Sequence, residues 1–190
     1  KVESQIEMCK NVIQSSLSAR EKAKLGLRWP IKELVIVSKN KEVVETVELL
    51  RDIIQKQTNV KSISVLESLP EVKIKIKPEY GKIGSVYGNL STEIITKLTI
   101  DSPETILGHI ETENVYKFKV KNKEVNITKE MFSIERKVPE LYKESEFKNG
   151  LVYVNTERTE KLEAEGYARE VMRNVQNLRK KVGMEKLDEI

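Results

Sequence analysis

The sequence contains few of the residues that metal sites and covalent catalysis require. Its single cysteine, Cys9, excludes an internal disulfide and a cysteine-cluster metal site. Its single histidine, His109, lacks a second imidazole or thiol with which to share a metal ion, and it would have to serve any catalytic triad unaided. No phosphate-binding loop of the Gly-x-x-x-x-Gly-Lys-Ser/Thr type occurs. We therefore expect no metal site, no bound cofactor and no catalytic residue.

Long apolar runs are also absent from the sequence. A membrane-spanning helix needs about 18 to 20 predominantly apolar residues, and no stretch approaches that length. The N-terminus has a mixed polar and apolar helical pattern, which differs from that of a signal peptide. These features predict a cytoplasmic protein that does not contact a membrane. The helical pattern begins at Lys1 without an initiator methionine, so we expect the sequence to be a piece of a longer chain.

The pattern of apolar residues predicts an α+β fold. Helical spacing covers residues 2–25, a stretch capped by Asn40, a stretch near residues 91–98, and a long terminal helix capped by Thr156. Alternating or fully apolar runs predict short strands at residues 31–38, 60–66, 72–77, 115–120, 124–127, 131–137, 143–147 and 151–154.

This order of elements predicts an N-terminal helix leading into a small β-α-β-β unit. A mainly antiparallel sheet and a long C-terminal amphipathic helix follow. Hydrophobic residues make up 38% of the 190 residues and charged residues 34%, which predicts one or two compact domains with charged surfaces. We expect domain boundaries that divide the chain into residues 1–30, 31–105 and 106–190.

The terminal helix carries two contrasting faces. One face holds apolar residues at alternating steps of four and three, namely Ala164, Ala168, Val171, Val175, Leu178 and Val182. The nearly opposite face holds Arg169, Arg173, Gln176 and Lys180. Residues 167–181 contain five basic residues and one acidic residue, so we expect the apolar face to pack inward and the basic face to lack acidic partners. Gly166 should cost about 1 kcal/mol in a helix interior, which predicts close packing there.

Several other basic segments have both a functional and an ordinary interpretation. Lys73, Lys75 and Lys77 alternate along one predicted strand, and a second row of lysines follows another strand at positions 117, 119 and 121. The two rows could together form one basic sheet face that contacts phosphates. Alternatively, they form the solvated side of a half-buried antiparallel sheet or are edge residues that discourage strand pairing. The segment Gly81-Lys82-Ile83-Gly84 is either a glycine turn or a backbone-clamping loop like that of K-homology domains.

Two segments resemble isoleucyl-tRNA synthetase, a class I aminoacyl-tRNA synthetase. Residues 18–32, SAREKAKLGLRWPIK, resemble the junction that follows the anticodon-binding helical bundle of that enzyme family. Residues 165–181, EGYAREVMRNVQNLRKK, resemble its late C-terminal helix. The order and separation of the two segments also fit, so the resemblance spans the chain. The form resembled is the archaeal and eukaryotic one, because bacterial relatives often end in a four-cysteine zinc module, which this chain lacks.

The resemblance implies that this chain is a C-terminal appendage of an enzyme that joins isoleucine to its tRNA. Residues 1–30 would then be the end of the anticodon-binding bundle and a linker. The His-Ile-Gly-His and Lys-Met-Ser-Lys-Ser motifs of the catalytic domain do not occur in the sequence, nor does the editing domain. ATP and Mg²⁺ would bind in that missing catalytic domain. We therefore expect the chain alone to be inactive, with tRNA(Ile) and the catalytic, editing and anticodon-bundle domains as its partners.

The expected nucleic-acid contacts follow from the basic residues. Arg169, Arg173 and Lys180 would contact phosphates, and Gln176 and Asn177 would hydrogen-bond a ribose or base edge. Secondary candidates are Arg28, Lys73, Lys75, Lys77 and Lys82. We interpret Trp29 as a packing anchor in preference to a base-stacking residue. The alternative function is a module that docks on another protein or domain, with K-homology-like binding as a further possibility.

Overall fold

The computed structural model describes residues 2–184, which form two compact units. Unit 1 contains residues 1–70 and 138–190, and unit 2 contains residues 71–137. Unit 2 is therefore inserted into unit 1. This division differs from the expected boundaries after residues 30 and 105, because the two segments of unit 1 form one sheet and share one core.

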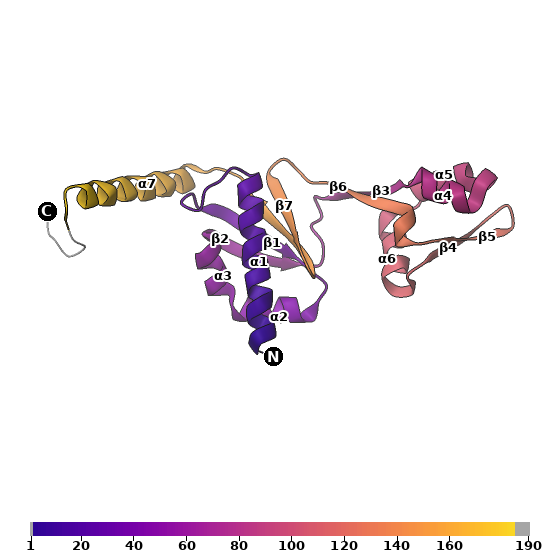
Figure 1. Ribbon diagram of the computed structural model, residues 1–190, viewed down its shortest axis with the longest axis horizontal. Coiled ribbons are helices and arrows are strands. Elements are labelled where there is room, and N and C mark those ends of the chain that lie inside the picture. Colours follow the sequence, from indigo (N-terminus) through magenta and orange to yellow (C-terminus); the bar gives the residue numbers. More distant parts are fainter. Residues whose placement is uncertain (1, 185–190) are drawn as a thin grey trace. The chain divides into compact units, whose positions relative to one another are not determined.

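Unit 1 is built on a four-stranded sheet with the strand order β2-β1-β8-β7 (Figure 1). Its strands are β1 (Ile31–Val37), β2 (Val60–Leu66), β7 (Tyr142–Phe147) and β8 (Gly150–Asn155). The β1–β2 pair is parallel, whereas β8 pairs antiparallel with both β1 and β7. Leu34, Val35 and Ile36 are all buried, which explains the continuous apolar run in the central strand β1.

Four helices complete unit 1, namely α1 (Val2–Lys22), α2 (Lys41–Leu49), α3 (Arg51–Thr58) and α7 (Glu160–Lys181). The first three pack on the sheet in one apolar core, which includes Val12 of α1, Val47 of α2 and Ile54 of α3. Asn40 caps α2 as predicted, through a 2.8 Å hydrogen bond that its side chain accepts from the Glu42 amide. The predicted single helix is divided near Leu50 into α2 and α3.

Both edge strands of this sheet are covered by side chains of the adjacent helices. On β7, Ser15 Oγ donates to the Glu146 carbonyl at 2.8 Å and Lys22 Nζ donates to the Glu144 carbonyl at 2.8 Å. On β2, side chains of α3 donate to outward carbonyls in the same way, from Gln55 to Lys61 at 2.6 Å and from Arg51 to Ile63 at 2.5 Å. These donors occupy backbone acceptors that would otherwise invite another strand to pair.

Unit 2 has a separate core, formed by two short two-stranded sheets and three helices. The strands are β3 (Lys73–Pro78), β4 (Tyr116–Val120), β5 (Lys123–Ile127) and β6 (Phe132–Lys137). The helices are α4 (Tyr80–Tyr87), α5 (Ser91–Ile100) and α6 (Pro103–Glu113), with short 3₁₀ turns η1 (Gly88–Leu90) and η2 (Lys129–Met131). Strands β3 and β6 pair antiparallel and bring the two ends of the unit together at Lys73 and Lys137.

The predicted strands and the α+β class are confirmed, but two helices of unit 2 were missed. Residues 80–87 form α4 in place of the expected glycine turn or loop, and residues 103–113 form α6, where no helix was predicted. Ile83 is completely buried in α4 and Ile106 in α6. Burial of these apolar residues stabilises the helices and offsets their poor local propensity. No helix in the described part of the chain is long and apolar enough to cross a membrane.

Candidate nucleic-acid interface

Helix α7 is attached to unit 1 through its first two turns. The cap is Thr159, whose hydroxyl accepts a 3.3 Å hydrogen bond from the Leu162 amide, so the predicted cap at Thr156 lies three residues too early. Leu162 and Gly166 are the buried residues of the helix. A Cβ atom on Gly166 would lie 2.1 Å from Cε3 of Trp29. The predicted close packing at Gly166 is confirmed, and the partner is the only tryptophan of the chain.

Trp29 is a packing anchor, as predicted. Its ring makes an edge-on contact with Tyr167, at 5.1 Å between centroids and an interplanar angle of 82°. The Arg158 guanidinium lies over the ring, 4.7 Å from its centroid. With Gly166 against the same ring, three residues near the start of α7 contact Trp29. These contacts fix the helix to the segment that precedes β1.

Buried Arg20 organises the backbone around this anchor. Its guanidinium donates to the carbonyls of Thr58 at 3.0 Å, Gly26 at 2.6 Å and Trp29 at 2.6 Å. Burial and, to a lesser extent, the nearby charge of Arg158 lower the pKa of Arg20 to about 10, so the group stays protonated at neutral pH. This role of Arg20 was not predicted from the sequence. The available signal was its helical spacing from Val12 and Ser16, which are both fully buried.

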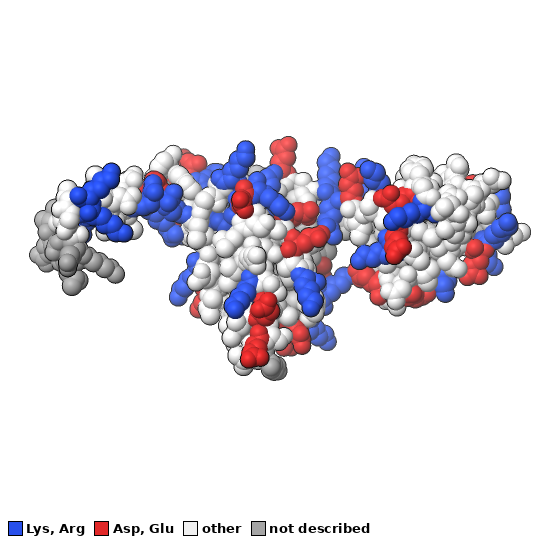
Figure 2. Space-filling model, in the orientation of Figure 1, with Lys and Arg blue, Asp and Glu red and all other residues white. Residues whose placement is uncertain are grey.

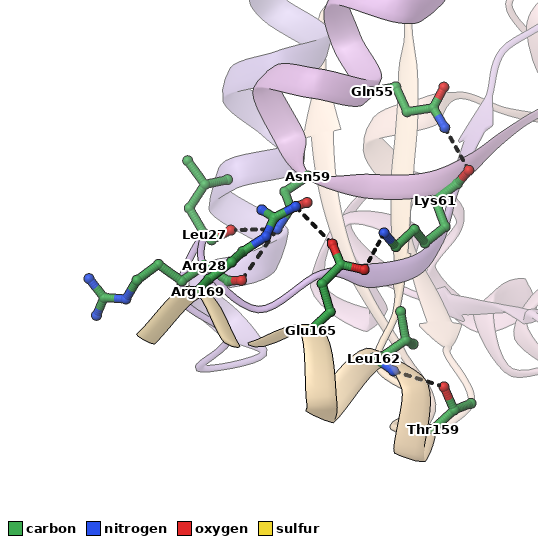
Figure 3. A network of polar contacts seen from close by, with 9 residues as sticks. All are labelled: Leu27, Arg28, Gln55, Asn59, Lys61, Thr159, Leu162, Glu165 and Arg169. Atoms are coloured by element: carbon green, nitrogen blue, oxygen red, sulfur yellow. Dashed lines mark hydrogen bonds and ion pairs between the residues drawn. The ribbon is translucent and has the colours of Figure 1, made fainter. Parts of the chain in front are cut away.

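Two glutamates of α7 pair with the arginines that were expected to be free. Glu165 accepts from Lys61 at 2.5 Å and from Arg169 at 2.8 Å (Figure 3). The hydrogen bond from Lys61 is the main cause that lowers the pKa of Glu165. Glu170 binds Arg28 at 2.7 Å and Arg173 at 2.5 Å. The expectation that the basic face of this helix lacks acidic partners is therefore wrong for Arg169 and Arg173.

The orientation of α7 is the reverse of the one predicted. The face that carries Leu162, Gly166 and Arg169 lies against unit 1, and the apolar face points outward. All six residues of the predicted inward face are exposed, namely Ala164, Ala168, Val171, Val175, Leu178 and Val182. Beyond Glu170, α7 extends away from the sheet and helices of unit 1 (Figure 1).

The three remaining candidates on α7 lie on this extended part. Gln176, Asn177 and Lys180 are exposed, and within residues 2–184 the structure gives none of their side chains a hydrogen bond or an ion pair. On the face drawn in Figure 2, basic side chains gather along this helix with few acidic ones. Residues 171–182 contain four basic residues and no Asp or Glu. A phosphate backbone would meet a cationic surface there.

The lysine rows of unit 2 lie on different two-stranded sheets. Lys73, Lys75 and Lys77 are exposed on β3, as predicted, while Ile74 and Ile76 of the same strand are at least partly buried. Lys117 and Lys119 are exposed on β4, which pairs only with β5 among the described strands. The idea of a single sheet face that contains both rows is therefore wrong.

The K-homology interpretation of Gly81-Lys82-Ile83-Gly84 is also wrong. These residues lie inside α4, with Ile83 buried in the core of unit 2, so they do not form a loop that could clamp a backbone. The alternative of a glycine turn is equally excluded. Lys82 is exposed on this helix as a single cation. His109 lies within α6, 3.6 Å from the Glu113 carboxylate, and no cluster of three metal-binding side chains occurs within the described residues.

Comparison with known proteins gives relatives that match nearly the whole chain. Isoleucine–tRNA ligase of Archaeoglobus fulgidus is 31% identical over 187 residues, and that of Methanocella arvoryzae is 30% identical over 188, each match covering 97% of this chain. The ligase of Thermococcus kodakarensis is 30% identical over 190 residues and 100% of this chain. The chain is related to the isoleucine–tRNA ligases over its whole length. The predicted resemblance is confirmed.

The chain spans only about a sixth of each isoleucine–tRNA ligase that it matches. The share is 17% of the relative's length in all three cases, which agrees with the resemblance to one region of the enzyme, its C-terminal region. The three source organisms are archaea, in accord with the resemblance to the archaeal and eukaryotic form of the enzyme. The chain matches no protein-family model.

Proposed function

We propose that this chain is a tRNA-binding, non-catalytic part of an isoleucine–tRNA ligase. It would assist recognition of tRNA(Ile) on the anticodon side of the molecule. ATP and Mg²⁺ would act in the catalytic domain of the parent enzyme, outside this chain. The catalytic, editing and anticodon-bundle domains of the same polypeptide would be its protein partners.

One observation carries the proposal. Residues 171–182 of α7 contain four cations and no anion, and they extend from unit 1 in a chain related to tRNA ligases. An ordinary solvated helix mixes both signs of charge, because i to i+4 pairs of opposite sign stabilise it. A helix that contains no acidic residue for three turns is suited to an anionic partner that neutralises its cations.

The individual contacts follow from which cations are already paired. The side chain of Lys180 makes no ion pair in the described residues and is available to a phosphate. The charge of Arg173 is partly neutralised by its ion pair with Glu170. Gln176 and Asn177, beside Lys180 on the same side of the helix, would hydrogen-bond a ribose hydroxyl or a base edge. Arg28 and Arg169 would contribute less, because each already pairs with a glutamate of α7.

The exposed row Lys73, Lys75 and Lys77 would supply secondary phosphate contacts. Alternate residues on a strand lie about 6.6–6.8 Å apart, so three lysines cover several nucleotides of a backbone. The row faces Glu135 across the β3–β6 ladder, at the register position of Lys75. That carboxylate reduces the local field, and we rank this row below α7. Lys82 ranks last because it is a single cation on α4.

Titration of the chain with tRNA(Ile), followed by fluorescence anisotropy, tests the proposal. Charge reversal at Arg173→Glu and Lys180→Glu together should weaken binding at least tenfold, because it removes two cations and adds two repelling charges. The matched control is Lys117→Glu with Lys119→Glu, which makes the same change in net charge on β4. The control should stay within about threefold of the wild type. Equal affinity loss in both variants, or none in either, would reject α7 as the binding site.

A further inference from the structure

The most unusual surface of the molecule is the aliphatic row on the outer side of α7. Val171 is 60% exposed, Val175 41%, Leu178 62% and Val182 72%. Single exposed apolar residues are common in soluble proteins, whereas a contiguous row is characteristic of an interaction site. Unit 1 does not cover this row, because α7 is attached through its opposite side at Leu162 and Gly166.

The spacing of the row is that of a coiled-coil seam. The four residues follow at steps of four, three and four, which correspond to successive d and a positions of a heptad. Counted in this way, Asn174 and Lys181 flank the seam at g positions, and Met172 and Arg179 flank it at e positions. Such a seam packs against another helix, whose apolar residues fill the spaces between its side chains.

The proposed RNA contact does not account for this row. At about 100° per residue, Lys180 and Gln176 point roughly 140–180° away from the seam. Aliphatic side chains also lack the donors and the aromatic rings with which proteins recognise RNA. The two long sides of this part of α7 therefore carry different chemistry, and each calls for its own partner.

Charge narrows the choice of partner. The seam has no Asp or Glu from residue 171 to 182, and basic residues flank it on both sides near its end. In a parallel pair of two copies, these flanking cations would meet cations. In an antiparallel pair of the same row they would meet Met172 and Asn174, which are uncharged. A helix with glutamates beside its apolar seam complements this surface better than a second copy does.

We infer that the row Val171, Val175, Leu178 and Val182 is a docking surface for an acidic amphipathic helix of another protein or domain. Its apolar seam would bury the row, and its glutamates would pair with the cations on either side. The RNA-binding side of α7 would remain accessible, so the helix would be held between two partners. This inference is independent of whether the opposite side binds tRNA.

A designed peptide tests the inference directly. The probe has three heptads with valine at a, leucine at d and glutamate at e and g, and the matched probe has lysine at e and g. Fluorescence anisotropy should show saturable binding of the glutamate peptide by the 190-residue chain, and binding of the lysine peptide at least tenfold weaker. Val175→Ser with Leu178→Ser should weaken binding of the glutamate peptide at least tenfold. Gln176→Ser with Asn177→Ser, the control on the opposite side, should leave it unchanged within twofold.

Four outcomes would overturn the inference. The first is equal affinity for the two peptides, or no binding of either. The second is unchanged affinity in the Val175→Ser, Leu178→Ser variant, whose exposed positions should leave far-ultraviolet circular dichroism intact. The third is a dimer of the wild-type chain in sedimentation equilibrium that this variant abolishes, since the row would then belong to a second copy. Loss of tRNA binding in the same variant, with peptide binding retained, would assign the row to RNA and equally reject the inference.

Discussion

The two halves of α7 differ in both charge composition and surroundings. In residues 160–170 the helix is fixed by Leu162, Gly166 and ion pairs, and its charges are matched by charges of opposite sign. In residues 171–182 every residue except the partly buried Arg179 is exposed, and this half contains no Asp or Glu. The comparison shows that a glycine against a tryptophan fixes a helix where a row of valines does not. Shape complementarity decides which side of the helix packs inward, and apolar content alone does not.

The tryptophan anchor gives the largest expected effect. Trp29→Ala removes the ring that contacts Gly166, Tyr167 and Arg158, and should lower the free energy of unfolding of unit 1 by about 2–3 kcal/mol. Urea denaturation followed by circular dichroism measures this. Val182→Ser, in the exposed half, should change it by less than about 0.5 kcal/mol. Similar values for the two variants would show that the halves of α7 are not distinct.

Paired glycine substitutions sharpen the comparison. Gly166→Ala should destabilise unit 1 by about 1–2 kcal/mol, because the new methyl group would overlap the Trp29 ring and overpacking outweighs the better helix propensity. Gly84→Ala, in α4, meets no atom within 4 Å and should stabilise unit 2 by up to about 1 kcal/mol. Thermal unfolding of both variants shows whether each change lowers or raises the stability of its unit. A stabilising Gly166→Ala would contradict the close contact at this position.

The ion pairs of the first half predict a small dependence on pH. The pKa of Glu165 is lowered chiefly by the hydrogen bond from Lys61, so this pairing stabilises the fold above the usual glutamate pKa of about 4.5. The contribution is lost as the pH falls through the lowered pKa of the folded state. The intrinsic fluorescence of Trp29 should report loosening of α7 in that acidic range.

Glu165→Gln provides the control for this pH dependence. The variant should lose that part of the acid transition and be less stable at pH 7 by less than about 1 kcal/mol, as is typical of partly exposed ion pairs. Glu163→Gln, one turn from the anchor and exposed, is the matched change. If both variants kept the wild-type acid transition, Glu165 would have no part in holding the helix.

Much of the fold was predictable from local patterns. Leu34–Val37 predicted a central strand, the alternation of lysine and isoleucine predicted β3, and Gly166 predicted a close contact. Each of these signals depends on a residue's immediate neighbours in sequence. The resemblance of residues 18–32 and 165–181 to one enzyme family added the relationship that the comparisons confirm.

The errors concern interactions between residues distant in sequence. The orientation of α7 depends on Trp29 and Lys61, which lie more than 100 residues earlier in the chain. The basic face of α7 was predicted to lack acidic partners, but Glu165, one turn before Arg169, pairs with this arginine. The same carboxylate also binds Lys61 of β2, a contact that the sequence of the helix does not reveal. The insertion of unit 2 depends on the pairing of Lys73 with Lys137, which no local pattern reveals. Helix α4 was not predicted because its two glycines, Gly81 and Gly84, have low helix propensity. The burial of Ile83, which stabilises the helix, cannot be read from so short a segment.

The salt dependence of tRNA(Ile) affinity tests the central claim most directly. Three or four phosphate contacts on α7 should lower the logarithm of the association constant by roughly 0.7 to 0.9 per contact for each tenfold rise in salt, or about 2 to 3.6 in total. Arg173→Glu with Lys180→Glu should reduce that slope by about two contacts' worth, while Val175→Ser with Leu178→Ser should leave it unchanged. A wild-type affinity that does not vary with salt, or a slope unaffected by the charge reversal, would contradict RNA recognition by the cationic side of this helix.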